Sequence, residues 1–245
     1  MKKKKVTKRK SNTSSGKISA SRRKRKKQLK KRIAIVSVCA FIGVILLALG
    51  YHHLVTGRYQ DADLELMTDE DWIGAPKLDV KLLDVNEYSR PQIPLKEVNG
   101  IVIHYTANPG SSAKANRDYF NNLKDSHTTK ASSHFIIGLE GEVIQCIPTK
   151  EISYASNDRN SDTISIECCH PDDSGKYNDA TYQSVVQLTG WLCVRFGLTS
   201  EDVIRHYDVT GKLCPKYFVE NEDAWNLFKV DVENKIQEIK QLRSI

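Results

Sequence analysis

Residues 100–105 read Gly-Ile-Val-Ile-His-Tyr, an apolar and largely β-branched run that ends on a histidine and a tyrosine. Such a run is typical of a strand buried inside a sheet, whose last side chains emerge at the rim. A second run of the same kind, Thr-Ile-Ser-Ile-Glu-Cys, occupies residues 163–168. These two stretches predict the centre of a sheet, around which the remaining elements can be placed.

Further strands and helices alternate along the chain. A hairpin is predicted at Glu140-Gly141, where a turn separates two short apolar segments. The strongest helix runs from Asp179 to Phe196, with Asn178 or Asp179 as its N-cap and Gly197 at its end. The other expected elements are strands at 134–139 and 142–147, a short apolar segment at 203–205, and helices from Ser112 to Leu123 and from about Glu222 to Leu242. We expect an α/β (α+β) fold with a central mixed β-sheet flanked by helices.

The net charge of +7 averages two unlike parts of the chain. Residues 1–32 hold 17 of the 37 Lys and Arg and no acid, which leaves 20 basic against 30 acidic side chains elsewhere. The next 19 residues, Ile33 to Tyr51, carry no charge and show no polar face. As a helix this run would span roughly 28 Å, close to the hydrocarbon thickness of a bilayer. The pattern predicts a single-pass membrane anchor at 33–55 behind a basic cytoplasmic tail.

Two other interpretations of this N-terminal part stay open. Ala48-Leu49-Gly50 loosely resembles a cleavage site, so a removed signal peptide is the alternative to an uncleaved anchor. The basic tail alone would also suit a DNA-binding membrane protein, but that interpretation leaves the motifs below unexplained, and we expect no nucleic-acid partner. The expected location is the cell membrane of a Gram-positive-type bacterium, with the folded part outside the cell.

Residues 56–97 are acidic and contain three prolines. Their apolar side chains are scattered, apart from a possible short helix near Asp69 to Ile73. This composition predicts an extracytoplasmic stalk, followed by one compact domain at 98–245.

Cys39 falls in the predicted span, and five cysteines lie beyond it. An odd number leaves at least one thiol outside any intramolecular disulfide.

His104, His206 and Cys214 form a candidate metal site. His104 comes at the end of the first apolar run, His206 follows the segment at 203–205, and Cys214 lies eight residues further on. Two imidazoles and one thiolate are a three-ligand zinc set that leaves the fourth tetrahedral position for water. Cys214 would also account for the odd cysteine. A lone histidine at a strand end is more often structural, so spacing alone leaves both interpretations open.

Four motifs occur in an order that resembles a known family. They are Ile-Val-Ile-His-Tyr-Thr-Ala at 101–107, Ser-His-Phe-Ile-Ile at 133–137, Ile-Ser-Ile-Glu at 164–167, and Arg-His-Tyr-Asp-Val-Thr-Gly-Lys-Leu-Cys-Pro at 205–215. From about Val98 to Phe218 the chain is similar to the amidase-2 family of N-acetylmuramoyl-L-alanine amidases, which includes phage lysins and peptidoglycan recognition proteins. The last motif is the most specific of the four.

The resemblance implies zinc-dependent hydrolysis of the amide between N-acetylmuramic acid and L-alanine in peptidoglycan. It places the zinc ligands on His104, His206 and Cys214. It places the general base on Glu167 and the family's lysine on Lys212, which would offset the oxyanion. Peptidoglycan and the membrane are the partners implied.

Two further residues are candidates for substrate binding. Ser133 stands where phage relatives carry a tyrosine that assists catalysis, and His134 follows it. His134 suits a groove-lining or ligand-orienting role as well as that of a hydrogen-bonded strand histidine. Cys168-Cys169-His170 looks like a metal cluster, but consecutive strand residues point apart, so joint ligation is not expected.

A membrane-anchored receptor that binds peptidoglycan without cutting it is the alternative function. Recognition-only members of the similar family typically lack the cysteine ligand. The presence of Cys214 together with Glu167 and Lys212 therefore favours the enzyme.

Overall fold

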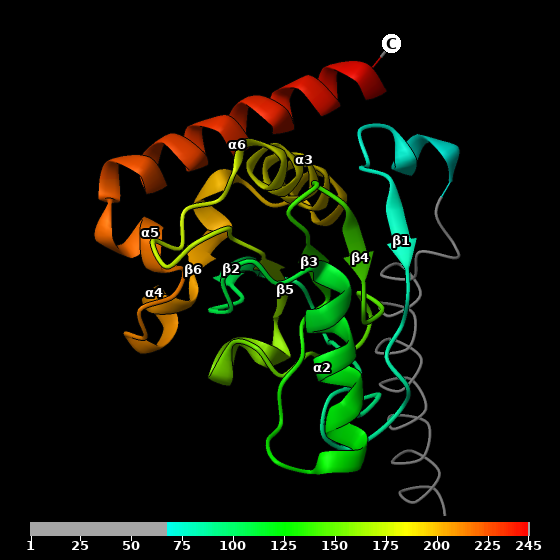
Figure 1. The fold of residues 1–245 in the computed structure, drawn as a ribbon. Helices are drawn as coiled ribbons and strands as arrows, with labels where there is room; N and C mark the ends of the chain where they lie inside the picture. The colour runs from blue at the N-terminus through cyan, green and yellow to red at the C-terminus, as the bar shows by residue number, and fades with distance from the viewer. Residues whose placement is uncertain (1–67, 245) are drawn as a thin grey trace, which may run out of the picture. The chain divides into compact units, whose positions relative to one another are not determined.

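The computed structural model describes residues 68–244 of the protein. At its centre is a six-stranded sheet with the order β1-β4-β3-β5-β2-β6 (Figure 1). Its strands are β1 (Leu78–Val80), β2 (Gly100–Tyr105), β3 (Phe135–Ile137), β4 (Val143–Gln145), β5 (Thr163–Cys168) and β6 (Val203–Arg205). Neighbouring strands are parallel except β3 and β4, which form the predicted antiparallel hairpin. The central mixed sheet expected from the sequence is confirmed.

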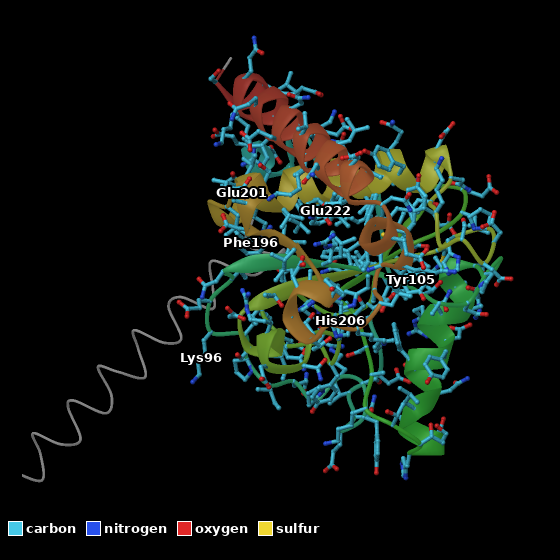
Figure 2. All side chains as sticks on the ribbon, turned by 90° about the vertical axis from the view of Figure 1, so that its left-hand side faces the viewer. Lys96, Tyr105, Phe196, Glu201, His206 and Glu222 are labelled. Carbon is cyan, nitrogen blue, oxygen red and sulfur yellow. The ribbon has the colours of Figure 1, made fainter. Side chains whose placement is uncertain are left out.

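Helices cover both faces of this sheet. On one face α3 (Asp179–Phe196) and α6 (Glu222–Arg243) pack against each other, and on the opposite face lies α2 (Ala113–Ser126) (Figures 1 and 2). The shorter helices are η2 (Asp69–Trp72), η3 (Asn157–Ser161), η4 (Ser200–Asp202), α4 (His206–Thr210) and α5 (Lys216–Glu220). The result is a three-layer arrangement of helices, sheet and helix.

Alternate side chains of each strand face different helical layers, because successive residues of a strand point to opposite faces. In β5, Ile164 and Ile166 point into the larger core under α3 and α6. In β3, Ile136 points the other way, into a smaller core under α2. His104 of β2 and Glu167 of β5 alternate with the residues that enter the larger core. Both side chains therefore face the α2 side of the sheet.

The ends of α3 show why its bounds could be predicted. The Asn178 side-chain oxygen accepts a hydrogen bond from the Thr181 backbone N–H at 2.9 Å, which satisfies one of the free donors at the helix start. Gly197 ends the helix in the left-handed region at φ 68°, where a residue without a Cβ is favoured. Capping and hydrophobic pattern thus agree on this element.

The segment 68–97 belongs to the folded domain, which corrects the predicted boundary at Val98. β1 extends the sheet by pairing in parallel with β4, and Leu83 is only 1% exposed. Arg90 donates two hydrogen bonds of 2.8 Å to the carboxylate of Glu151 in a largely buried ion pair. The stalk interpretation failed for this segment because a three-residue strand leaves almost no periodic signal, and apolar residues scattered in sequence converge in space.

Two predictions concern the membrane and the cysteines. Between residues 68 and 244 no helix is long and apolar enough to cross a bilayer. The predicted anchor at 33–55, the basic tail and residues 56–67 lie outside the described residues. All five cysteines of the described part are buried and free, so none of them is in a disulfide.

Candidate metal centre and active-site cleft

Three parallel strands bring the polar residues of the motifs to one edge of the sheet. β5, β2 and β6 lie side by side and run in the same direction, so their carboxyl ends share an edge. In the β2–β5 pair His104 is the direct partner of Glu167. His206 is the residue that follows β6 and opens α4. The order of the strands, and not their distance in sequence, therefore assembles the site.

A tight return of the chain after α4 adds Cys214. Gly211 ends α4 at φ 77°, a left-handed conformation that glycine adopts without steric cost. The backbone N–H of Tyr207 then donates to the carbonyl of Cys214 at 2.8 Å, which closes the loop against the helix. This turn carries Lys212 to the cavity and places the cysteine beside the two histidines.

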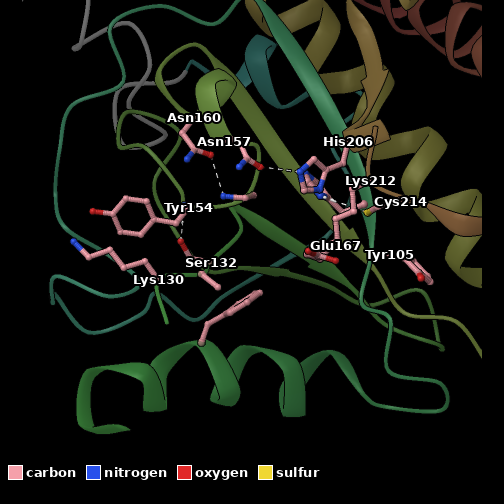
Figure 3. Close-up of a pocket in the computed structure, with 14 residues that line it drawn as sticks. Tyr105, Lys130, Ser132, Tyr154, Asn157, Asn160, Glu167, His206, Lys212 and Cys214 are labelled. Carbon is pink, nitrogen blue, oxygen red and sulfur yellow. Dashed lines mark hydrogen bonds between the residues drawn. The ribbon is translucent and has the colours of Figure 1, made fainter. Parts of the chain in front are cut away.

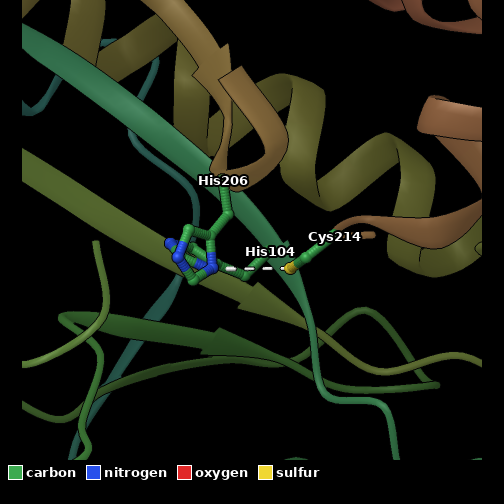
Figure 4. A group of neighbouring side chains, drawn as sticks. All are labelled: His104, His206 and Cys214. Atoms are coloured by element: carbon green, nitrogen blue, oxygen red, sulfur yellow. Dashed lines mark hydrogen bonds between the residues drawn. The ribbon is translucent and has the colours of Figure 1, made fainter. Parts of the chain in front are cut away.

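His104, His206 and Cys214 offer ligand atoms that all lie within 4.8 Å of one another (Figure 4). The Sγ of Cys214 is 3.8 Å from Nδ1 of His104, and the two imidazole rings are 4.7 Å apart between centroids. All three side chains are at most 5% exposed. Within residues 68–244 no other group of three or more metal-ligating side chains comes together in this way.

The three residues fit a zinc ion in their chemistry. Nδ1 of His206 is buried without a hydrogen-bond partner, an arrangement that costs free energy unless something occupies the space before it. Burial, with the charges of His206 and Lys212, holds the pKa of His104 well below its usual range, so its ring is neutral, as a ligand must be. Burial also raises the pKa of the Cys214 thiol to about 12, and a bound cation supplies the charge that a thiolate needs there.

Glu167 lies beside this group and lines the same cavity. One of its carboxylate oxygens, Oε2, is buried and has no hydrogen-bond partner. Burial raises the pKa of Glu167 to about 8, against the opposing charge of Lys212. A carboxyl group that lines the cavity and whose pKa lies near neutrality can both take up and release a proton under physiological conditions.

The cavity has a volume of about 330 Å³ and extends away from the three candidate metal ligands toward α2 (Figure 3). It is also lined by Phe120 of α2, by Lys130 and Tyr154 from loops, and by Asn160 of η3. The Lys130 ammonium lies 5.6 Å from the centre of the Tyr154 ring, within reach of a cation–π interaction. A substrate with an extended polar chain thus has room on one side of the metal position.

Ser133 and His134 do not line this cavity, which corrects the expectation that they bind substrate. Both are fully buried. The Ser133 hydroxyl donates to the carbonyl of Ser165 at 3.0 Å. Nε2 of His134 lies 2.8 Å from the carbonyl of Glu151, and its Nδ1 accepts from the Ser165 backbone N–H at 3.0 Å. These contacts bind the strands together, and substrate contacts have to come from other residues.

The Cys168-Cys169-His170 run does not form a metal site, as expected from strand geometry. Cys168 lies in the core under α3 and α6, whereas Cys169 lies in the core under α2. Nδ1 of His170 is 2.7 Å from the carbonyl of Asp172, and its ring packs against Tyr105. The two thiols are core residues on opposite faces of the sheet.

Three polar residues in the segment before β5, which includes the short helix η3, were not singled out in the sequence. Ser156 and Asn157 contact the two metal-site histidines, and Asn160 supports the loop from within. A polar Ser-Asn-Asp stretch between strands looks like any surface turn. Only its position beside the ends of β2 and α4 shows what these side chains contact.

Comparisons with known proteins agree with this architecture. The family model described as N-acetylmuramoyl-L-alanine amidase, amidase-2, matches residues 94–217. The N-acetylmuramoyl-L-alanine amidase CwlL of Bacillus licheniformis is 37% identical over 163 residues, which are 61% of this chain and 45% of that protein. The amidase BlyA of Bacillus subtilis (strain 168) is 33% identical over 175 residues, or 63% of this chain and 46% of the relative. This chain therefore spans less than half the length of either relative.

Solved structures show the same fold. PlyL superposes with a TM-score of 0.56 at 22% identity, covering 64% of this chain and 98% of PlyL. The catalytic domain of XlyA gives 0.54 at 23% identity, covering 64% of this chain and 99% of that domain. At these identities the likeness concerns the fold alone.

Proposed function

The chain belongs to the amidase-2 family of N-acetylmuramoyl-L-alanine amidases, and from this premise we propose that it is a zinc-dependent enzyme that cuts the amide between N-acetylmuramic acid and L-alanine in peptidoglycan. One observation carries the proposal. His104, His206 and Cys214 converge within 4.8 Å, in the same cavity as Glu167 and Lys212. A wall-binding receptor would need neither a metal set nor a carboxyl group poised beside it.

The chain's own residues supply the remaining chemistry. Zinc, when held by the two histidines and the cysteine, would lower the pKa of water and polarise the amide carbonyl. Glu167 takes the proton from the attacking water and returns it to the leaving amine of L-alanine. Lys212 offsets the negative charge that develops on the amide oxygen, an effect worth roughly 3–4 kcal/mol in comparable sites. The burial of the site strengthens each of these interactions by excluding water.

The experiment combines metal analysis with digestion of purified peptidoglycan. We expect one zinc per wild-type chain and the release of new L-alanine amino groups. Cys214→Ser should lose zinc and activity together, whereas Cys193→Ser, at a buried thiol in the α3 core, should keep both. Glu167→Gln should keep zinc and lose turnover by roughly 10²- to 10⁴-fold. The control Glu238→Gln, on the exposed side of α6, should keep both zinc and turnover. Tight binding to peptidoglycan without zinc or released amines would instead establish the receptor.

We further propose that residues 33–55 anchor the protein in the cell membrane, with the enzyme outside. The support is the uncharged run from Ile33 to Tyr51 behind 17 basic residues. The anchor would confine cutting to wall near the membrane. In cell fractionation the full-length protein should sediment with membranes and require detergent for release, and a protein found free in the medium would contradict the anchor.

A further inference from the structure

Two consecutive residues at the start of η3 each contact the Nε2 atom of one of the two histidines proposed to hold the metal. Nε2 of His104 lies 3.2 Å from Oγ of Ser156, and Nε2 of His206 lies 3.0 Å from Oδ1 of Asn157. Figure 3 shows the Asn157 side chain directed at His206. The Nδ1 atoms are on the other side of the rings. That of His104 is 3.8 Å from Cys214 Sγ, and that of His206 has no partner.

These contacts bear on which nitrogen of each ring carries the hydrogen. A neutral imidazole has one N–H and one lone pair, and only the nitrogen with the lone pair can bind a metal. An amide oxygen accepts hydrogen bonds and cannot donate them, so Asn157 Oδ1 favours the hydrogen on Nε2 of His206. Oγ of Ser156 can accept from Nε2 of His104, although a hydroxyl, unlike an amide oxygen, can also donate. The Asn157 contact leaves the lone pair of His206 on Nδ1, and the Ser156 contact is compatible with the same arrangement at His104.

The loop that provides these acceptors is held by its own hydrogen bonds. The Asn160 side-chain oxygen accepts from the backbone N–H groups of Ala155 and Ser156 at 3.0 and 2.6 Å. The Ser132 hydroxyl accepts from the Tyr154 N–H at 2.9 Å, and the Ser132 N–H donates back to the Tyr154 carbonyl at 3.1 Å. These hydrogen bonds hold the segment around Ser156 and Asn157 from within.

Asn157 also has a special backbone conformation. Its φ is 52°, in the left-handed region, which asparagine adopts more readily than most residues other than glycine. The position thus needs a residue that tolerates this conformation and carries an acceptor. Asparagine meets both requirements, and the two can be separated by substitution.

We propose that Ser156 and Asn157 are positioning residues of the metal centre. They hold His104 and His206 in the tautomer with hydrogen on Nε2, and aim both Nδ1 lone pairs at one point before the metal binds. Partners of this kind orient metal-binding imidazoles and raise their basicity. The inference rests on the proposed function for the identity of the metal, but the tautomers are a property of the metal-free chain.

The first test measures zinc affinity of the full-length protein by competition with a chromophoric chelator. Asn157→Gly keeps the left-handed backbone and removes the acceptor, whereas Asn157→Asp keeps both. We expect the glycine variant to bind zinc roughly 10- to 100-fold more weakly and the aspartate variant to bind it about as tightly as wild type. An equal loss in both variants, or no loss in either, would overturn the proposal.

The second test reads the tautomers directly by ¹⁵N NMR of the imidazole rings after zinc removal. In wild type both rings should carry hydrogen on Nε2. Asn157→Gly should give a mixed tautomer at His206 alone, and Ser156→Ala at His104 alone. Unchanged tautomers in both variants would refute the positioning role, even if the variants were less stable. A wild-type protein that bound no zinc would defeat the proposed function and leave this second test intact.

Discussion

Lys212 influences the pKa of four side chains around the candidate metal site. Burial is the main cause of the raised pKa of Glu167 and of the lowered pKa of His104 and His206; the charge of Lys212 opposes burial at Glu167 and adds to it at the two histidines. It also opposes the rise in the pKa of the Cys214 thiol. A single ammonium group therefore favours the carboxylate, the thiolate and the neutral imidazoles, which are the protonation states that a metal centre and a general base require.

Replacing Lys212 should separate catalysis from metal binding. Lys212→Met keeps the length of the side chain and removes the charge that stabilises the developing oxyanion, so turnover on peptidoglycan should fall by about 10²-fold. With zinc in excess, zinc content should stay at the wild-type level, because the three proposed ligands are unchanged. Initial rates and metal analysis on the same samples check both statements. Lys240→Met on α6 serves as the control, and equal rates for the two variants would remove Lys212 from the mechanism.

His134 should make stability depend on pH. Burial lowers its pKa to about 4, whereas in the unfolded chain it titrates near the ordinary 6.5. As the pH falls below 6.5 the unfolded state takes up a proton that the folded state refuses, so the free energy of unfolding declines until about pH 4. The full effect is about 3 kcal/mol. Urea unfolding between pH 4 and 7, with a chelator present, should show a smaller decline for His134→Gln, and parallel curves would disprove this assignment.

At the scale of elements, the geometry of the site depends on where three strands and one short helix end. β2, β5 and β6 stop at the same edge, and α4 has only five residues before Gly211 turns the chain back. None of these ends is long enough to hold its shape alone, because isolated short helices are marginal in water. The turn after α4 is therefore the part of the metal centre most sensitive to backbone changes.

Substitution of Gly211 should test this dependence. The glycine has φ 77° and nothing within 4 Å of where a Cβ would lie, so any effect of Gly211→Ala comes from backbone conformation. We expect a loss of about 1–2 kcal/mol in stability together with weaker zinc binding, and a milder effect for Gly211→Asn. Gly197→Ala, also left-handed and uncrowded but at the end of α3, should lose similar stability with unchanged zinc affinity. Urea unfolding and chelator competition distinguish the two sites.

The sequence predicted the long elements well, since β2, β5 and α3 have the expected bounds, and the three candidate ligands that it named lie close together. What it could not give depended on tertiary placement. Ser133 and His134 belong to a family motif, yet their side chains are fully buried and do not line the cavity. Asn157 carries no periodic or motif signal, because its contact with His206 joins residues 49 positions apart.

At the scale of the whole molecule, the segment 68–93 extends the domain beyond residues 94–217, which match the family model. Trp72 stacks on Trp191 at 5.7 Å, and the Trp191 indole N–H donates to the carbonyl of Asp71 at 2.8 Å. Together with β1 and the Arg90–Glu151 ion pair, these contacts fasten the N-terminal part of the domain to its helices and loops. The segment is a structural part of the fold.

Truncation of Leu83 should show whether the segment contributes to stability. Leu83 is 1% exposed in the core under α2, so Leu83→Ala should cost about 2–5 kcal/mol. Val85→Ala, at a side chain that is 55% exposed, should change stability by less than about 0.5 kcal/mol. Thermal or urea unfolding of the full-length variants makes the comparison. Equal, near-zero effects would restore the stalk interpretation.

The order of the strands also has a mechanical consequence. A pulling force applied at residue 68, where the described part of the chain begins, enters the domain through η2 and β1, at the edge of the sheet opposite to β6. β1 has three residues, and peeling it from β4 breaks few hydrogen bonds. If growing wall pulls on a tethered enzyme, β1 should detach first. The strands β4, β3 and β5 would then still separate the detached edge from β2, which carries His104. Single-molecule extension should then show a small early step that leaves zinc in place.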